Sequence, residues 1–218
     1  MPFIKICGLK TYDEARLALD AGATAFGFLV ALNYETADRI SPEIAADIIG
    51  KLPKTAETVI VTHLTDPDKA ADLARYTGAH TLQVHGDMRP AGVRQLVALA
   101  PSLRLIKAVH VSGPDSLETA AAYADIAHAL LLDTRTADRL GGTGRTHDWS
   151  ISAQIVTAVP VPVYLAGGLT PDNVQRAIET VRPAGVDVNS GVKDSAGGKD
   201  RRKVGLFVSR ALGALAGS

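Results

Sequence analysis

The sequence contains one cysteine, so no disulfide can form within the chain, and a reducing compartment is the natural setting for it. Neither sign of charge is in excess, because 23 Lys and Arg balance 23 Asp and Glu. A protein that binds nucleic acid or a membrane surface by electrostatic attraction needs a basic excess. We therefore expect neither nucleic acid nor a membrane among its partners.

Long apolar runs and internal boundaries are also missing. No run approaches the roughly 20 residues that span a bilayer, and charges follow the first residues too soon for a signal peptide. No linker, low-complexity tract or change of composition divides the chain. A chain of 218 residues buries roughly 70% of its unfolded surface, which is enough for a full core. The expectation is one cytoplasmic domain over residues 1–218.

Short apolar runs alternate with amphipathic segments along the whole chain. The runs are rich in Val, Ile and Leu and lack polar alternation, which is typical of strands buried on both faces. Strands are expected at Phe3–Cys7, Ala25–Val30, Thr58–Thr62, Thr81–His85, Arg104–Val109, Ala127–Leu132, Val161–Ala166 and Gly185–Val188. Helices are expected at Thr11–Ala21, Pro42–Leu52, Pro67–Tyr76, Ala91–Leu99, Pro114–Tyr123, Pro171–Val181 and Asp200–Leu215. Candidate N-caps are Thr11, Ser41, Asp66 and Thr170.

Eight strand–helix units predict an α/β protein, a single-domain (β/α)8 TIM barrel with about 25 residues a unit. An open doubly wound sheet is the alternative, and it usually carries a Gly-x-Gly-x-x-Gly turn after its first strand. That turn is absent, because the first run ends in Cys7-Gly8-Leu9-Lys10. In a barrel, the functional site lies at the carboxyl ends of the strands.

Glycines gather where the last two expected strands end. In barrels, these two loops often bind phosphate through backbone amides and a short helix N-terminus. Glycines that merely serve the turns are the alternative. Because both loops match in the right order, we expect a phosphate site there. Its candidate residues are Gly167, Gly168, Asn189, Ser190 and Gly191.

Cys7 and Asp133 follow strands on roughly opposite sides of the expected barrel mouth. Asp133 comes after four apolar residues, where burial can raise the pKa of a carboxyl enough for acid catalysis. Lys5 shares the face of Cys7, and a nearby cation lowers the pKa of a thiol. Lys5 could equally pair with a carboxylate inside the barrel. An inert core cysteine and a capping aspartate are the alternatives to an acid–base pair.

Short motifs run through nearly the whole chain in the order of one known family. They are Lys5-Ile6-Cys7-Gly8, Val84-His85-Gly86, Ile106-Lys107-Ala108-Val109, Leu131-Leu132-Asp133-Thr134, Gly141-Gly142-Thr143-Gly144, Asp148-Trp149, Ala166-Gly167-Gly168-Leu169-Thr170-Pro171-Asp172-Asn173-Val174, Val186-Asp187-Val188, Ser190-Gly191-Val192 and Lys199-Asp200. Together these motifs resemble the phosphoribosylanthranilate isomerase family of tryptophan biosynthesis. That family is a (β/α)8 barrel that rearranges N-(5-phosphoribosyl)anthranilate, an aminoaldose, to the 1-deoxyketose without metal or cofactor.

The resemblance implies a role for each matching residue. Asp133 would be the general acid that protonates the ring oxygen, and Cys7 the general base that removes the C2′ proton. Arg39 would pair with the anthranilate carboxylate.

Further matching residues would complete the site that the resemblance implies. Asp187 and His85 would face the substrate, and Gly142 and Gly144 would join the phosphate site. The partner would thus be a small phosphorylated substrate, and neither a cofactor nor a metal is expected.

Other functions stay open at this stage. Glu35 and Asp38 add negative charge beside Arg39, and Lys193 stands where the family has an acid, so a related enzyme for another phosphorylated sugar derivative is one alternative. His63, His85 and His110 follow adjacent strands and could converge on a metal ion. A barrel that binds a phosphorylated ligand without catalysis is the third alternative. The oligomeric state is not predicted.

Overall fold

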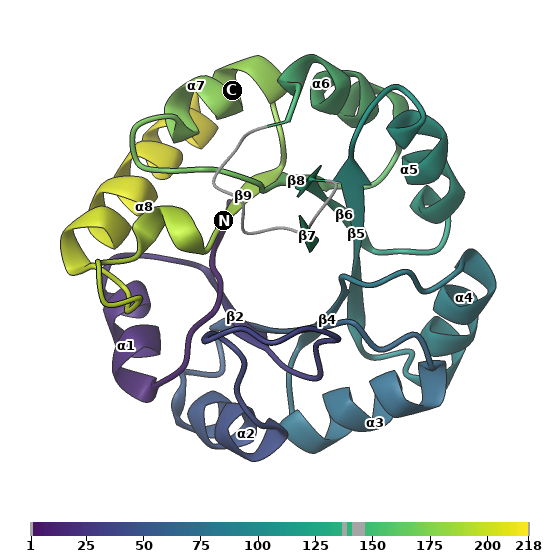
Figure 1. The fold of residues 1–218 in the computed structure, drawn as a ribbon, viewed down its shortest axis with the longest axis horizontal. Coiled ribbons are helices and arrows are strands. Elements are labelled where there is room, and N and C mark those ends of the chain that lie inside the picture. Colours follow the sequence, from purple (N-terminus) through teal and green to yellow (C-terminus); the bar gives the residue numbers. More distant parts are fainter. Residues whose placement is uncertain (1, 137–138, 141–146, 218) are drawn as a thin grey trace.

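The computed structural model describes residues 2–136, 139–140 and 147–217. Eight parallel strands close into a barrel inside a ring of helices, which confirms the TIM barrel (Figure 1). The strands pair in the order β5-β4-β3-β2-β1-β9-β8-β6, and β5 pairs with β6 to close the barrel. The barrel strands are β1 Phe3–Ile6, β2 Ala25–Leu29, β3 Glu57–Thr62, β4 Thr81–Val84, β5 Arg104–Val111, β6 Ala129–Thr136, β8 Val163–Leu165 and β9 Gly185–Val188.

Helices follow the strands and pack on the outside of the barrel. They are α1 Tyr12–Asp20, α2 Pro42–Lys51, α3 Pro67–Thr77, α4 Pro90–Leu99, α5 Ser116–Ala124, α6 Trp149–Ala158, α7 Val174–Val181 and α8 Arg201–Ala216, with a short 3-10 helix η1 at Ser190–Val192. Three expected N-caps are confirmed, because the side chains of Thr11, Ser41 and Asp66 accept hydrogen bonds from backbone amides in the first turn. The fourth is wrong, since α7 begins at Val174 with Asn173 as its N-cap.

The strand β6 differs from the expectation. β6 continues past Leu132 to Thr136, and its end pairs antiparallel with a short strand, β7 Arg139–Leu140. Asp133 therefore lies within β6, in register with His110 of β5. The helix α6 completes the eight expected strand–helix units, although no range had been given for it.

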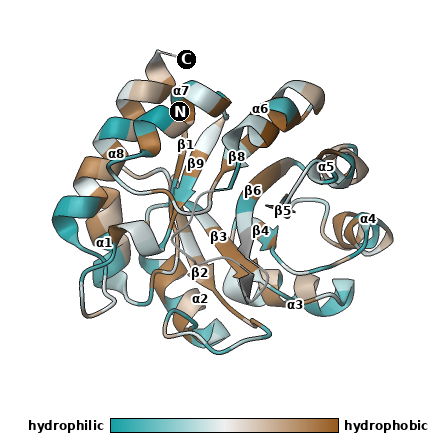
Figure 2. Cartoon of the chain, turned by 45° about the horizontal axis from the view of Figure 1, so that its top comes forward, coloured by the Kyte–Doolittle hydropathy of each residue, from teal (hydrophilic) through white to brown (hydrophobic). Residues whose placement is uncertain are grey.

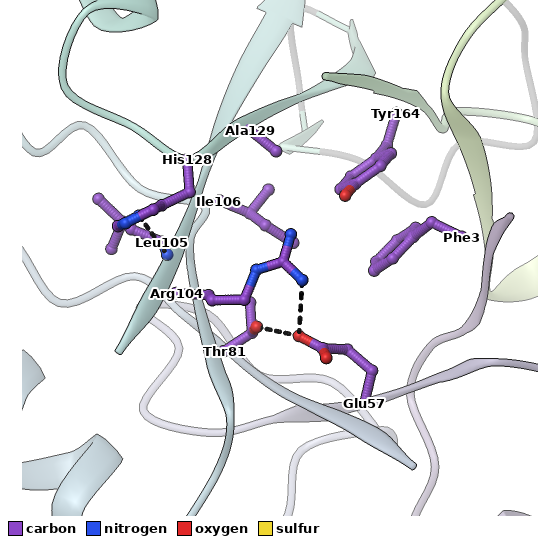
Figure 3. A pocket seen from close by; sticks show the side chains of 9 residues that line it. All are labelled: Phe3, Glu57, Thr81, Arg104, Leu105, Ile106, His128, Ala129 and Tyr164. Atoms are coloured by element: carbon purple, nitrogen blue, oxygen red, sulfur yellow. Dashed lines mark hydrogen bonds and ion pairs between the residues drawn. The ribbon is translucent and has the colours of Figure 1, made fainter. Parts of the chain in front are cut away.

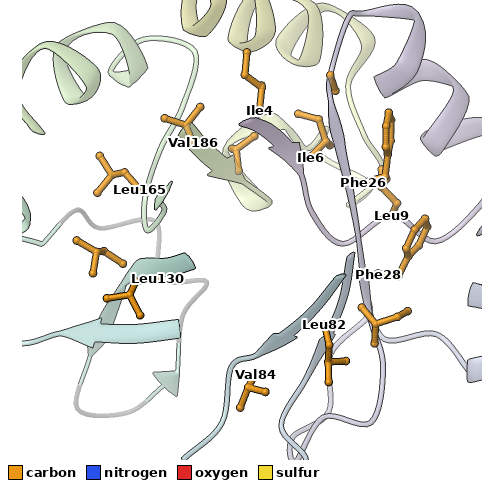
Figure 4. Packing of buried hydrophobic residues seen from close by; sticks show 14 of the residues in the cluster. Ile4, Ile6, Leu9, Phe26, Phe28, Leu82, Val84, Leu130, Leu165 and Val186 are labelled. Atoms are coloured by element: carbon orange, nitrogen blue, oxygen red, sulfur yellow. The ribbon is translucent and has the colours of Figure 1, made fainter. Parts of the chain in front are cut away.

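Side chains alternate between the two faces of the strands, and this alternation positions the site. Ile4 and Ile6 of β1 belong to the large apolar cluster between strands and helices, as do Phe26 and Phe28 of β2 (Figure 4). The strands β2 and β3 are largely hydrophobic, whereas hydrophilic residues lie on the outer sides of helices (Figure 2). Lys5, between Ile4 and Ile6, consequently points into the barrel.

Packed side chains close the amino-terminal end of the barrel. Phe3 and Tyr164 stack with ring centroids 3.8 Å apart, and Glu57 accepts a hydrogen bond from Thr81 beside Arg104 (Figure 3). The small pocket among these residues lies at the starts of the strands, opposite the expected site. None of the helices described by the structure is long and apolar enough to cross a membrane.

Candidate active site

A buried ion pair joins β1 to β9 inside the barrel. Lys5 is fully buried, and its Nζ lies 3.1 Å from Oδ2 of Asp187, its register partner. Nζ also donates to Oε1 of Gln83 on β4. Burial acts to lower the pKa of Lys5, but Asp187, Cys7 and Asp133 together outweigh it and the pKa is raised. Of the two expected roles, Lys5 thus takes the one of pairing with a carboxylate.

A row of polar side chains leads from this ion pair to Asp133. Lys5 donates to Oε1 of Gln83, so the amide nitrogen of Gln83 faces Nδ1 of His85 at 3.0 Å. Nδ1 then accepts, and the imidazole proton resides on Nε2, 3.5 Å from Oδ2 of Asp133. Burial keeps the pKa of His85 well below 6.5, with further lowering from His110 and the other nearby cationic groups. His85 is therefore a neutral donor beside the Asp133 carboxyl.

The surroundings of Asp133 favour its protonated form. Burial raises its pKa to about 7, and Asp187 adds to this effect, whereas a hydrogen bond from the Thr134 amide and the charge of Lys5 oppose it. The Thr134 amide donates to Oδ1 at 2.7 Å. A carboxyl that holds its proton near neutral pH is suited to act as a general acid.

Cys7 lies at the carboxyl end of β1 and is 5% exposed. Its amide donates to the Val188 carbonyl at 2.8 Å, which continues the β1–β9 ladder. Gly8 has φ +69° and turns the chain away from the barrel. Burial raises the pKa of the thiol to about 12, and Asp187 adds to this, while Lys5 and Lys199 act to lower it. Cations near Cys7 therefore decide how readily it becomes a base.

The backbone of Gly27 on β2 limits the space beside this thiol. A Cβ on Gly27 would lie 2.8 Å from Sγ of Cys7 and 3.1 Å from its Cα. Gly27→Ala is expected to displace the thiol and to lower kcat at least about tenfold, since overpacking shifts side chains and backbone.

Steady-state kinetics test this expectation, with Gly50→Ala as the control. Gly50 lies in α2, and nothing comes within 4 Å of the Cβ it would gain. The control should keep full kcat. Equal kcat in Gly27→Ala and Gly50→Ala would show that a Cβ at position 27 does not displace the Cys7 thiol.

The glycine loops after β8 and β9 lie side by side. Gly167 and Gly168 have φ +81° and +66°, and a Cβ on Gly191 would lie 1.9 Å from the Leu169 carbonyl oxygen. Within the described part of the chain, no group accepts hydrogen bonds from the amides of Gly167, Gly168 and Ser190. Such adjacent amides can bind an anion.

Of the other residues predicted for the phosphate site, the structure describes Asn189 but not Gly142 and Gly144. The side chain of Asn189 bonds to Asp38 and Lys199, and its carbonyl oxygen accepts from Lys199, which leaves its backbone amide for a ligand.

Arg39 lies in the loop after β2. Its guanidinium lies 2.9 Å from the Glu35 carboxylate, with 39% of the Arg39 side chain and 85% of the Glu35 side chain exposed. Asp38 instead is buried, and Nζ of Lys193 lies 2.6 Å from its carboxylate. The negative charge of Asp38 is thus balanced by Lys193 rather than directed at Arg39.

The three histidines form a row across the ends of β3, β4 and β5. His63 and His85 stack with centroids 5.5 Å apart, and His110 meets His85 edge-on at 4.9 Å. His63 bonds to Asn33 through Nδ1, and Nε2 of His110 lies 3.1 Å from the His85 carbonyl oxygen. Among the described residues, no group of three or more His, Cys, Asp or Glu side chains is placed to hold a metal ion. The row therefore ties neighbouring strand ends together.

Sequence reasoning missed several residues of the site. Gln83 could have been found, because it is a polar residue in an apolar run and shares the face of His85 two residues later. Lys199, although part of a matching motif, had no assigned role. Nothing local in the sequence signals that Asp38 pairs with Lys193.

Comparisons with known proteins agree with this geometry. The family model described as N-(5'phosphoribosyl)anthranilate (PRA) isomerase matches residues 4–210. The chain is 40% identical to N-(5'-phosphoribosyl)anthranilate isomerase 2 of Methanosarcina mazei, over 95% of this chain and 93% of that protein. It is 41% identical to the N-(5'-phosphoribosyl)anthranilate isomerase of Halobacterium salinarum, over 97% and 96%.

Solved structures give the same result. The phosphoribosyl anthranilate isomerase of Thermotoga maritima superposes with a TM-score of 0.86 at 35% identity, covering 98% of this chain and 100% of that one. A phosphoribosyl anthranilate isomerase in complex with reduced 1-(o-carboxyphenylamino)-1-deoxyribulose 5-phosphate has a TM-score of 0.83 at 34% identity, with the same coverage.

Proposed function

Since the chain belongs to the N-(5'-phosphoribosyl)anthranilate isomerase family, we propose that Asp133 and Cys7 are the catalytic acid and base of its aldose–ketose isomerisation. The protein is an isomerase of tryptophan biosynthesis that acts on a small phosphorylated substrate. It converts N-(5'-phosphoribosyl)anthranilate, an aminoaldose, to the 1-deoxyketose by an Amadori rearrangement.

The reaction begins at the acid. Asp133 gives its proton to the ring oxygen, the bond from that oxygen to C1′ breaks, and the nitrogen lone pair forms a Schiff base. The observation that carries this assignment is the burial that raises the pKa of Asp133 to about 7. The neutral His85 beside it can donate a hydrogen bond to the carboxylate that remains.

The second step takes place at the base. The Cys7 thiolate removes the C2′ proton, and the electron pair of that bond forms an enolamine, which tautomerises to the ketone. Oδ1 of Asp187 is buried with no hydrogen-bond partner among the described residues, so it can accept a hydrogen bond from a substrate hydroxyl.

The glycine loops hold the phosphate, with the amides of Gly167, Gly168 and Ser190 as donors and Asn189 and Gly191 completing the loop. Gly142 and Gly144 belong to the same proposal through the family resemblance alone. Adjacent, unpaired amides in the two loops support this placement.

The setting and partners complete the proposal. The balanced charge supports an enzyme without nucleic-acid or membrane partners, and the single cysteine supports a cytoplasmic location.

Turnover of freshly generated N-(5'-phosphoribosyl)anthranilate tests the function directly, followed by the loss of substrate fluorescence. We expect fast turnover that a chelator does not change. A folded protein without turnover would contradict the proposal. Turnover that a chelator abolishes would indicate a metal ion, with His63, His85 and His110 as its candidate ligands.

Arg39 is the proposed partner of the anthranilate carboxylate. Its exposed pair with Glu35 is weak, so a substrate carboxylate can displace Glu35. Arg39→Ala is expected to raise KM about tenfold or more with little change in kcat, because the contact is made in the ground state and the transition state alike. Glu35→Gln, which removes only the competitor, should lower KM slightly. An unchanged KM in Arg39→Ala would place the carboxylate elsewhere.

A further inference from the structure

Lys199 is a buried lysine that the proposed mechanism does not use. It lies between η1 and α8 and is 7% exposed. Its Nζ donates to the carbonyl oxygen of Asn189 at 3.2 Å and to Oδ1 of the same residue at 2.8 Å. Its backbone amide donates to Glu14 of α1 at 3.2 Å. Side chain and backbone are both held in place.

The Lys199 ammonium lies at the turn that carries Cys7. Asn189 directly follows β9, and the Cys7 amide bonds to Val188, one residue earlier. A Cβ on Gly8 would lie 2.7 Å from Oδ1 of Asn189, the oxygen that binds Lys199. The side chain of Asn189 is therefore wedged between the Cys7–Gly8 turn and the ammonium.

Two cations act on Cys7, and among the described residues Lys199 is the one that no carboxylate pairs with directly. Lys5 of β1 also faces Cys7, but its charge is balanced at 3.1 Å by Asp187 of β9. Both oxygens that accept from Lys199 are neutral. The nearby acid, Asp38, is held by Lys193 through both of its oxygens at 2.6 Å.

Asn189 also fixes the distance between Lys199 and that acid. Its amide nitrogen donates to Asp38 at 2.9 Å, so one side chain lies between the lysine and the carboxylate. The ammonium therefore has no carboxylate in direct contact among the described residues.

We propose that Lys199 is a positioning residue of the isomerisation whose ammonium, held by Asn189, stabilises the thiolate of Cys7. This inference rests on the proposed role of Cys7 as the general base. Both lysines lower the pKa of Cys7 against the effect of burial. Burial lowers the pKa of Lys199 itself to about 8, with Cys7 and Asp38 acting in the opposite direction, so the ammonium is charged at neutral pH.

The rate of Cys7 alkylation by iodoacetamide tests the proposal without relying on turnover. Cys7 is the single cysteine, so mass spectrometry of the labelled chain reports on this thiol alone. Lys199→Gln keeps a donor for Asn189 but removes the charge. We expect it to react about tenfold more slowly than the wild type at neutral pH, as one unit of thiol pKa implies. Lys199→Arg should react like the wild type.

The pH profile separates charge from shape. The gap between the wild type and Lys199→Gln should narrow as the pH rises above about 8, where Lys199 loses its proton. In denaturant, the variants should react equally. Equal rates in the native state, or a gap that stays constant with pH, would overturn the proposal. Lys199→Met provides the same comparison if the Gln variant does not fold.

Turnover distinguishes this inference from the function on which it rests. If Cys7→Ala retained full turnover, the assignment of the base would fail, yet alkylation would still show whether Lys199 acts on the thiol. If both proposals hold, Lys199→Gln lowers kcat about tenfold with little change in KM, because thiolate is needed for proton removal rather than for binding.

Discussion

Asp133→Asn is expected to lower kcat at least about 100-fold, because a carboxamide cannot supply the proton that opens the sugar ring. The amide matches the carboxyl in size and can still accept the 2.7 Å hydrogen bond from the Thr134 amide. Binding should therefore survive. The measurements are kcat and KM for the substrate. A third is the Kd of reduced 1-(o-carboxyphenylamino)-1-deoxyribulose 5-phosphate, the compound bound in the solved complex of a relative.

The stability of the same variant provides an independent check with a definite sign. Burial raises the pKa of Asp133 from 3.8 to about 7. Between these values the native state binds more protons than the unfolded state, so this carboxyl lowers the free energy of unfolding as the pH rises. The penalty is absent below about pH 4 and complete above about pH 7. Asp133→Asn removes it, so its Tm relative to the wild type should increase over this range.

Two results would contradict this account. Near-full turnover of Asp133→Asn would remove the residue from the role of acid. A Tm difference that does not change with pH would mean that the carboxyl is not held protonated, whatever its part in turnover.

Cys7→Ala is expected to lower kcat by a similar factor, at least about 100-fold, through loss of the group that removes the C2′ proton. Ring opening depends on Asp133 and should still take place in this variant. Deuterium at C2′ should therefore slow the residual turnover of Cys7→Ala strongly and that of Asp133→Asn little. The two variants fail at different steps, and the isotope effect tells them apart.

The affinity for reduced 1-(o-carboxyphenylamino)-1-deoxyribulose 5-phosphate is the control for Cys7→Ala. It should change less than about threefold, since the thiol is not needed to hold the ground state. A variant that turns over normally, or one whose residual rate is insensitive to deuterium at C2′, would show that another group takes this proton.

The barrel and the place of its site could be predicted from the sequence because both follow from local patterns. Uninterrupted apolar runs indicate strands buried on both faces, and residues such as Cys7 and His85 then fall at the carboxyl ends of the strands. Ser41 and Asp66 indicate helix starts because a cap bonds to amides only two or three residues away.

Long-range partners could not be predicted in this way. Lys5 had two possible roles, and only the register of β1 against β9 places Asp187 beside it. The extension of β6 beyond Leu132 depends on pairing with β5 and then with β7, which the apolar pattern does not encode. Asp38 and Lys193 are separated by 155 residues, so the ion pair between them exists only once the barrel has closed.

The Asp38–Lys193 ion pair has a consequence for exchanging loops between relatives. A replacement for residues 30–40 without an acid at position 38 would leave Lys193 unpaired beside the buried Lys199. In the present structure, Asn189 lies between Lys199 and Asp38. Without Asp38, the ammonium groups of Lys193 and Lys199 would repel each other across Asn189. Position 193 must therefore be changed together with position 38, and the loops after β2 and β9 are transferable only as a pair.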